Sequence, residues 1–233
     1  MSLKVAILAG GMATRLRPLS FNIPKSLIGV NNRPFIEWQL RLLAESGINS
    51  VVLCLGYRAQ EIVEFVRDGS QFGVDVTYSI ENSPLGTGGA LRHAEPLLGD
   101  YFGVLYGDSY LPINYRQVFS AFESSSRLGL MTVYKNENNF DKSNVMINDK
   151  GDIRYSKRNF QSDMKYIDYG FSILRRQAIL HFAKEINFDL SELFEELSLA
   201  NQIDCYEVHQ RFYEVGSFNG IVELNSYLES ETK

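Results

Sequence analysis

Glycines and basic side chains gather in one short stretch near the start of the chain. Gly10 and Gly11 follow an apolar run, and Thr14, Arg15 and Lys25 come soon after them. Adjacent glycines lack Cβ atoms and allow positive φ, so their backbone N–H groups can turn toward a ligand. Guanidinium and ammonium groups add charge-assisted hydrogen bonds that suit phosphate oxygens. On composition alone, a phosphate-binding loop and a plain glycine turn with solvated basic residues are equally good interpretations.

This stretch is not one of the common nucleotide-binding loops. A Walker A loop ends in Gly-Lys-Ser or Gly-Lys-Thr and the dinucleotide fingerprint is G-x-G-x-x-G, and residues 8–19 contain neither pattern. The residues that lead into it, 4–9, are Lys-Val-Ala-Ile-Leu-Ala, without polar alternation. Such a run predicts a strand that is buried on both faces, as in a parallel sheet covered by helices.

Two further stretches could contribute to the same site. Residues 81–90, Glu-Asn-Ser-Pro-Leu-Gly-Thr-Gly-Gly-Ala, join a predicted strand to a predicted helix, and by composition they are an ordinary glycine-rich turn. Asp108 follows Gly107 and an apolar strand, where aspartate is often only a turn former. Ligands of open α/β sheets bind at the carboxyl ends of the strands, so we expect the loops at Gly10 and Asp108 to lie together.

Residues 8–19 and 24–25 resemble the signature of the sugar-1-phosphate nucleotidyltransferases, L-A-G-G-x-x-T-R-L-R-P-L followed by P-K. The resemblance extends from Val5 to Gly216. It implies a Rossmann-like, three-layer α/β/α fold of the nucleotide-diphospho-sugar transferase type, with a mostly parallel, mixed central sheet. It also implies transfer of a nucleoside monophosphate from an NTP to a sugar 1-phosphate, with release of pyrophosphate.

The resemblance assigns roles to the matching residues. Arg15 is expected to bind the β- and γ-phosphates, Lys25 the α-phosphate, and Asp108 together with Glu214 a Mg²⁺ cofactor, which prefers oxygen ligands. Glu214 stands where relatives usually carry aspartate. Arg15, Lys25 and Asp108 are therefore the expected catalytic residues. The expected nucleotide-binding residues are Leu8, Ala9, Gly10, Gly11, Thr14, Arg15, Lys25, Glu81, Gly86, Thr87 and Asp108.

Glu81 is expected to read the nucleobase, because the residue at this position does so in relatives, where the glycine matching Gly86 lets the backbone approach the base. An ionised carboxylate only accepts hydrogen bonds, and guanine presents N1–H and N2–H₂ side by side. GTP is therefore the favoured nucleotide, with CTP, UTP or dTTP as alternatives. The form E-x-x-P-L-G-T-G-G-A also looks most like the mannose- and heptose-1-phosphate guanylyltransferases.

The acceptor side departs from the family pattern. Relatives often show F-x-E-K-P, whose lysine meets the sugar phosphate; Lys157 keeps that lysine, but Ser156 and Arg158 replace the glutamate and the proline. Asp168 and Gly170 occupy the place of an N-x-G that touches the sugar. Lys157, Asp168 and Gly170 are thus the expected acceptor-binding residues, and a non-sugar phosphorylated acceptor is an alternative.

Strands and helices alternate along the sequence, which favours an α/β sheet with right-handed crossovers. We expect a single domain, residues 1–233, with a nucleotide-binding half up to about residue 110 and an acceptor-binding half from about residue 111. A hairpin is expected beside the sheet, with strands 145–147 and 153–155. The other expected strands are 4–9, 51–55, 74–80, 102–106, 128–134, 166–174 and 203–208, and the expected helices are 34–46, 60–67, 90–98, 115–126, 190–200 and 218–228.

Composition excludes several partners. The net charge of −5 and the pI near 5.3 argue against nucleic-acid binding, which needs a basic stripe, and no apolar run could span a membrane. Cys54 and Cys205 stand alone, so buried free thiols and a cytoplasmic location are expected. A homo-oligomer is compatible with the sequence. Of the competing classes, the retained Arg15, Lys25 and Asp108 argue against a non-catalytic regulatory homologue, and the missing glycine fingerprint argues against a nicotinamide-dependent dehydrogenase.

Overall fold

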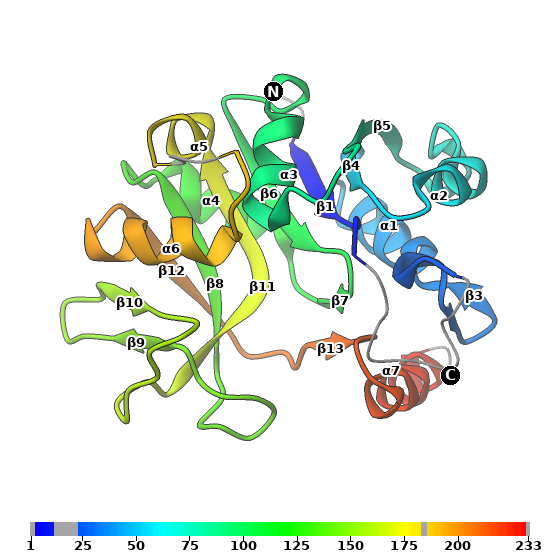
Figure 1. The fold of residues 1–233 in the computed structure, drawn as a ribbon. Coiled ribbons are helices and arrows are strands. Elements are labelled where there is room, and N and C mark those ends of the chain that lie inside the picture. The colour runs from blue at the N-terminus through cyan, green and yellow to red at the C-terminus, as the bar shows by residue number, and fades with distance from the viewer. Residues whose placement is uncertain (1–2, 12–22, 183–185, 232–233) are drawn as a thin grey trace.

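A long twisted sheet runs through the molecule (Figure 1). The computed structural model describes residues 3–11, 23–182 and 186–231, and within these residues the sheet has nine strands. The main strands, in order across the sheet, are β5 (Asp75–Ile80), β4 (Ser50–Leu55), β1 (Lys4–Leu8), β6 (Tyr101–Tyr106), β11 (Tyr166–Arg175), β8 (Gly129–Lys135) and β12 (Ile203–Val208).

Most of these strands run in the same direction. β1 pairs in parallel with β4 and β6, β4 pairs in parallel with β5, and β12 pairs in parallel with β8. β11 is antiparallel to β6 and β8, and its first residue, Tyr166, also pairs antiparallel with Val145 of β9 (Val145–Ile147). Val5, Ala6 and Ile7 are fully buried, as expected of a central strand covered on both faces. The predicted mixed, mostly parallel sheet is confirmed, and the carboxyl ends of β1, β4, β5 and β6 lie at one edge.

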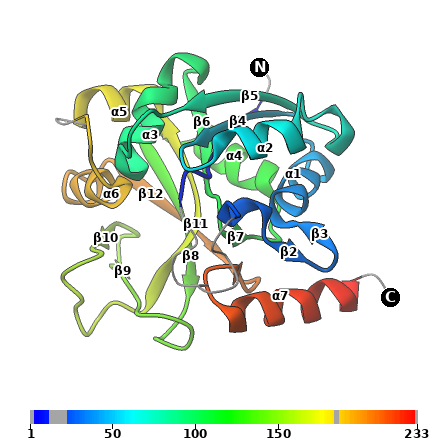
Figure 2. The ribbon, with the colours of Figure 1, turned by 45° about the vertical axis from the view of Figure 1, so that its right-hand side comes forward.

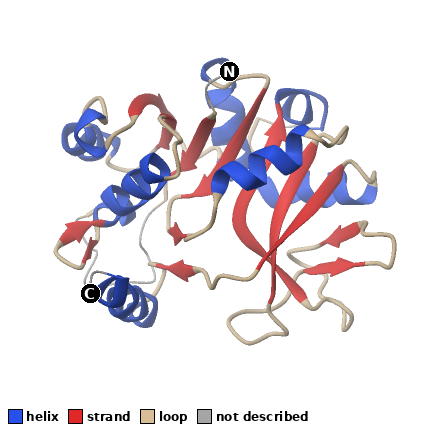
Figure 3. Ribbon diagram, turned by 180° about the vertical axis from the view of Figure 1, so that it is seen from behind, coloured by secondary structure: helices blue, strands red, loops and turns tan. Residues whose placement is uncertain are grey.

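Helices cover both faces of the sheet (Figure 3). The helices are α1 (Phe35–Glu45), α2 (Ala59–Val66), α3 (Gly86–Ala94), α4 (Tyr115–Glu123), α5 (Arg176–Phe182), α6 (Leu190–Leu199) and α7 (Phe218–Glu231). On one face, Leu40 of α1, Ile62 of α2 and Phe119 of α4 share a buried cluster. On the other, Leu91 of α3 and Phe194 of α6 belong to a second cluster, to which α5 also contributes. The predicted three-layer α/β/α architecture is confirmed.

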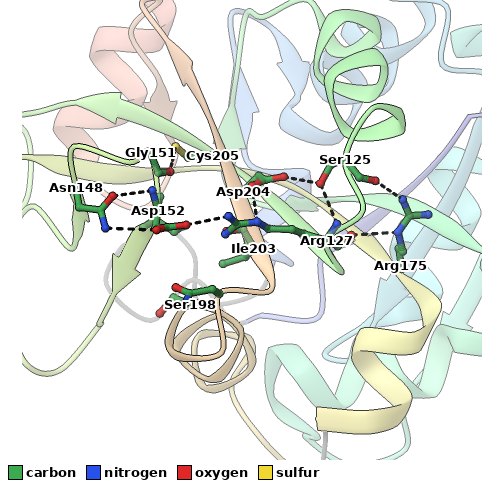
Figure 4. A network of polar contacts seen from close by, with 12 residues as sticks. Ser125, Arg127, Asn148, Gly151, Asp152, Arg175, Ser198, Ile203, Asp204 and Cys205 are labelled. Carbon is green, nitrogen blue, oxygen red and sulfur yellow. Dashed lines mark hydrogen bonds and ion pairs between the residues drawn. The ribbon is translucent and has the colours of Figure 1, made fainter.

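The predicted hairpin is formed by β9 (Val145–Ile147) and β10 (Ile153–Tyr155). Arg127 joins it to the edge of the sheet, because its guanidinium group lies 2.8 Å from Asp152 beside the hairpin turn and 2.9 Å from Asp204 on β12 (Figure 4). The hydrogen bond from Arg127 holds the pKa of Asp152 below its usual value. The hairpin is therefore anchored by charge as well as by its strand pairing.

A smaller cluster lies beside the sheet, where α7 is drawn in red in Figure 2. Leu224 and Leu228 of α7 are buried in it together with Phe35 and Val215. The short strand β13 (Tyr213–Glu214) precedes α7 and pairs antiparallel with β7 (Ser109–Tyr110), which directly follows the turn after β6. The late part of the chain thus returns to the loops after the first strands. The short strands are β2 (Gly29–Val30), β3 (Arg33–Pro34), β7 (Ser109–Tyr110) and β13 (Tyr213–Glu214).

Some expectations were wrong in detail. Helix α3 begins at Gly86 rather than at residue 90, and α5, which follows β11 without a break, was not predicted. Both cysteines are free thiols as expected, but Cys205 is only half-buried whereas Cys54 is buried. In the described parts of the chain, no helix has the length and apolar character to cross a membrane.

Candidate active site

A cavity of about 340 Å³ opens at the carboxyl ends of β1 and β6. Its walls come from the loop after β1, the 3-10 turn that begins at Lys25, the segment 81–90 and the turn after β6. Of the expected nucleotide-binding residues, Thr14 and Arg15 lie outside the described residues. All the others line this one cavity: Leu8, Ala9, Gly10, Gly11, Lys25, Glu81, Gly86, Thr87 and Asp108.

The most direct contact in the cavity wall joins Lys25 and Asp108. Lys25 Nζ lies 2.5 Å from Asp108 Oδ2, and the two side chains are 21% and 34% exposed. Gly216 lies against the same ammonium group, since a Cβ at that position would be 3.5 Å from Lys25 Nζ. Because the pair is partly open to the cavity, an incoming phosphate can bind the ammonium group in place of the carboxylate.

Two residues that sequence reasoning missed hold Asp108 in place. Gln39 of α1 is buried, and its Nε2 donates hydrogen bonds of 2.9 and 2.8 Å to two backbone oxygens of the turn 106–109. Gly107 packs so closely on β1 that a Cβ would lie 2.5 Å from Leu8 O. The sequence did contain a hint of this role, because Gln39 is an amide on the apolar face of the predicted helix 34–46. A buried amide is normally hydrogen-bonded, so a partner could have been expected.

Glu81 follows β5 and forms part of the cavity wall. Its Oε2 accepts a hydrogen bond from Leu85 N at 3.2 Å. Its Oε1 lies against two glycines, because a Cβ would be 2.6 Å from this oxygen at Gly56 and 3.4 Å from it at Gly10. The carboxylate also borders a second cavity, of about 420 Å³, which is lined by Gly10, Gly11, Gly56, Tyr57, Glu81, Asn82, Ser83 and Pro84.

The glycines of the segment 81–90 serve packing as well as the cavity. Gly86 has a φ of +74°, and a Cβ there would lie 2.5 Å from Phe188 O. The same oxygen accepts hydrogen bonds from Gly88 N and Gly89 N at 3.0 and 3.3 Å. The N–H groups of Gly88 and Gly89 therefore bind the chain before α6.

The expected acceptor lysine is linked to the nucleotide cavity through two neighbouring residues. Lys157 Nζ pairs with the carboxylate of Asp189 at 3.1 Å. Asp189 caps α6 by accepting a hydrogen bond from Ser191 N at 2.9 Å. The next residue, Leu190, donates its N–H to Thr87 Oγ1 at 2.8 Å, and Thr87 lines the cavity. Lys157 is thus connected to the cavity wall at Thr87 through Asp189 and Leu190.

Asp168 and Gly170 lie where β11 departs from regular pairing. The register with β8 shifts between Asp168 and Ser172, and Gly170 has a φ of +103°. Gly170 N donates to Asp168 Oδ1 at 3.0 Å, and Asp168 N donates to Asn144 Oδ1 at 2.9 Å. Burial nevertheless raises the pKa of Asp168 to about 6. Burial, and after it the charge of Asp168, raise the pKa of Tyr106, which lines the cavity.

Residues 4–153 match the family described as nucleotidyl transferase. The chain belongs to this family. The D-glycero-alpha-D-manno-heptose 1-phosphate guanylyltransferase of Campylobacter jejuni is 31% identical over 196 residues, which cover 83% of this chain and 86% of that protein. Mannose-1-phosphate guanyltransferase 2 of Candida glabrata is 35% identical over 153 residues, which cover 64% of this chain but only 42% of the relative. The resemblance stated from the sequence motifs is confirmed.

A solved structure of HddC from Yersinia pseudotuberculosis, complexed with GMP-PN, has the same fold as this nucleotidyltransferase. The TM-score is 0.80 at 23% identity, and the match covers 97% of this chain and 99% of that chain. Identity this low bears on the fold and not on the substrate. The predicted nucleotide-diphospho-sugar transferase type of fold is thus confirmed.

The donor atoms of the nucleotidyltransferase site suit a divalent metal. Asp108 offers a carboxylate at the cavity, and Mg²⁺ is usually held by one or two carboxylates together with substrate phosphates and water. Glu214 is opposite Ser109 in the β13–β7 pair, and Val215 N donates to Asp108 O at 2.9 Å. The structure therefore brings the backbones of Glu214 and Asp108 together. Asp108 is one of the described residues that line the cavity, however, whereas Glu214 is not among them.

Proposed function

We propose that this nucleotidyltransferase transfers GMP from GTP to a sugar 1-phosphate, which gives a GDP-sugar and pyrophosphate. The observation that carries the proposal is the position of the Glu81 carboxylate in the wall of the nucleotide cavity. A carboxylate accepts hydrogen bonds and suits the adjacent N1–H and N2–H₂ donors of guanine better than the single ring N–H of uracil or thymine. The Campylobacter jejuni relative is a guanylyltransferase, which supports the same base.

The chemistry required of the protein is positioning and neutralisation of charge. The acceptor phosphate is already an anionic nucleophile, so in-line attack on the α-phosphate of GTP needs no general base. Lys25 would exchange its contact with Asp108 for the α-phosphate, and the family motif assigns the β- and γ-phosphates to Arg15. A Mg²⁺ ion held by Asp108, with Glu214 as the proposed second ligand, would offset charge on the transferring group.

On the acceptor side, we assign Lys157 to the acceptor phosphate. Its ammonium group is half-exposed and pairs with the carboxylate of Asp189, which a dianionic phosphate can replace. Asp168 would then accept hydrogen bonds from hydroxyl groups of the acceptor, and Gly170 keeps the irregular backbone that presents it. These assignments support a hydroxyl-rich acceptor.

A second acceptor class is favoured by one observation. Ser156 occupies the place of a glutamate that meets a sugar hydroxyl in relatives, and its hydroxyl donates to Glu195 Oε1 of α6 at 3.0 Å. This serine is therefore engaged with α6. A phosphorylated polyol other than a sugar 1-phosphate is the alternative acceptor.

Measurement of pyrophosphate release tests both parts of the proposal. The nucleotides are GTP, CTP, UTP and dTTP, and each is combined with mannose 1-phosphate, a heptose 1-phosphate and inositol phosphate. We expect GTP to give the highest kcat/KM and one sugar 1-phosphate to exceed the polyol. A preference for UTP or dTTP would contradict the base assignment, and a preference for the polyol would replace the acceptor.

We further propose that the enzyme works in the cytoplasm. Both cysteines are free, and Cys205 is only half-buried, so it depends on a reducing environment to remain a thiol. Titration with a thiol reagent in freshly lysed cells should find both cysteines reduced.

A further inference from the structure

Gly56, in the turn after β4, is the residue packed most closely on the carboxylate of Glu81. A Cβ at Gly56 would lie 2.6 Å from Glu81 Oε1, 3.2 Å from its Cγ and 3.3 Å from its Cδ. The first of these distances is shorter than any ordinary contact between nonbonded heavy atoms. Glu81 can therefore take up its observed position only because residue 56 has no side chain.

The need for glycine at this position comes from Glu81 and not from the backbone. Gly86, by contrast, has a positive φ and would strike a backbone oxygen if it carried a Cβ. Gly56 is free of both constraints: its φ is not in the left-handed region, and the three atoms nearest to an added Cβ all belong to the Glu81 side chain. An added methyl group would thus displace a flexible side chain and leave the fold intact.

The space around Glu81 decides where the displaced carboxylate could go. Oε2 is held by Leu85 N, and Oε1 faces two glycines, where it would lie 2.6 Å from a Cβ at Gly56 and 3.4 Å from a Cβ at Gly10. A methyl group at position 56 would therefore turn Oε1 away from the lining that the two cavities share. Hydrogen bonds weaken steeply when distance and angle depart from the optimum, so the displaced carboxylate would lose its bond to one of guanine's two adjacent donors.

We propose that Gly56 is a specificity-determining position, whose missing side chain lets Glu81 present its carboxylate to the 2-amino edge of guanine. Gly56 acts through Glu81 and is a positioning residue. The inference rests on the proposed GMP transfer and adds to it a residue from a turn that the family motifs do not include.

The test compares GTP with ITP, because hypoxanthine keeps N1–H but lacks the 2-amino group. We expect the wild-type enzyme to favour GTP over ITP in kcat/KM by about tenfold or more, as a hydrogen bond to a charged group allows. In Gly56→Ala this ratio should fall to within about threefold of unity, mainly through loss of activity with GTP. Gly29→Ala is the matched control, since a Cβ at Gly29 meets no atom within 4 Å, and it should keep the wild-type ratio.

A double-mutant cycle shows whether Gly56 acts through Glu81. In a Glu81→Ala background, Gly56→Ala should change the GTP/ITP ratio no further, because the side chain that it displaces is already gone. The inference is overturned if Gly56→Ala keeps the wild-type GTP/ITP ratio, which includes the case of equal losses with both nucleotides. It is also overturned if the effects of the two substitutions on this ratio are additive in the cycle. If Gly56→Ala fails to fold, Gly56→Ala/Glu81→Ala decides, because recovery of folding supports the contact and failure to recover refutes it.

The same measurements separate this inference from the proposed function. A wild-type enzyme that prefers another NTP to GTP contradicts the proposed function, and the inference falls with it. A wild-type enzyme that prefers GTP, combined with a Gly56→Ala variant that retains the wild-type GTP/ITP ratio, overturns the role of Gly56 alone.

Discussion

Lys25 and Asp108, 83 residues apart in the sequence, form an ion pair of 2.5 Å where the loops after β1 and β6 meet. Each side chain is thereby held at the nucleotide cavity before any substrate arrives. In the reaction proposed above, the pair would separate, the carboxylate toward a metal ion and the ammonium group toward a phosphate. Their separation on binding would cost little, because each charge gains a partner of the opposite sign.

Asp108→Asn should lower kcat by roughly 100-fold or more, since charge stabilisation at a reacting centre commonly contributes this much. The fold should be retained, because asparagine has nearly the same shape and can still accept a hydrogen bond from Lys25. Steady-state kinetics with Mg²⁺, beside a thermal unfolding curve, would show this. Asp75→Asn, on an exposed position of β5, is the control. Near-normal kcat in Asp108→Asn would remove Asp108 from the catalytic residues.

Glu214→Asp restores the usual residue of the family motif, and we expect it to keep most of the Mg²⁺-dependent activity. Glu214→Gln removes the charge while keeping the length, so the Mg²⁺ concentration required for half-maximal activity should rise about tenfold or more. Activity measured across a Mg²⁺ titration distinguishes the two variants. A Glu214→Gln enzyme with an unchanged Mg²⁺ requirement would show that Glu214 is not a ligand.

Gln39→Leu should lower kcat several-fold without direct loss of a ligand contact. Two backbone oxygens of the turn 106–109 would lose their hydrogen bonds, which costs on the order of 1–3 kcal/mol and loosens the turn that carries Asp108. Kinetics and urea unfolding measure the two effects. Gln60→Leu, at an exposed amide on α2, should change neither. Full activity in Gln39→Leu would show that the turn keeps its shape without this clamp.

Lys157→Ala should raise KM for the phosphorylated acceptor about tenfold or more and leave KM for GTP nearly unchanged. The reason is that its ammonium group is proposed to meet only the acceptor phosphate. Arg158→Ala is a suitable control, because Arg158 is 77% exposed and its ion pair with Glu192 is long, at 3.7 Å. Equal increases in both KM values would place Lys157 elsewhere.

Asp168→Asn should change stability in a pH-dependent way. Burial raises the pKa of Asp168 from 3.8 to about 6, so the folded protein binds a proton that the unfolded chain releases. The free energy of unfolding therefore falls as the pH rises from 3.8, the unfolded value, to about 6, the folded value. Above this range the destabilisation caused by the buried, ionised carboxylate is fully present. The gain in stability of Asp168→Asn over the wild-type protein should therefore be larger at about pH 8 than at about pH 4. Melting temperatures at both values test this, and an equal difference at each would contradict it.

Local patterns in the sequence predicted most of the fold. The hairpin strands 145–147 and 153–155 and the strand 203–208 match the structure residue for residue, because alternation and turn residues mark them. The start of α3 could not be predicted, since Gly86 has a positive φ and packs against Phe188, which is remote in the sequence.

The same division holds for the site. The meeting of Lys25 and Asp108 follows from the rule that the carboxyl ends of parallel strands share one edge. The roles of Gln39 and Gly56 do not follow, because a buried amide and a turn glycine gain their meaning from single distant partners. The pairing of Lys157 with Asp189 was equally beyond reach, since two surface charges on separate elements carry no periodic signal.

Residues 213–216 pack against the turn after β6 although they are made much later during translation. Domains emerge from the ribosome with their N-terminal part first, so β1, β4 and β6 can pair before residues 213–216 have been made. Gly216, which lies against Lys25, and Val215, whose N–H binds Asp108 O, are then still missing behind these two residues of the cavity wall. A nascent or truncated chain would hold the nucleotide loop without its closing side, and so competence for the reaction would arrive only as translation of this domain nears its end.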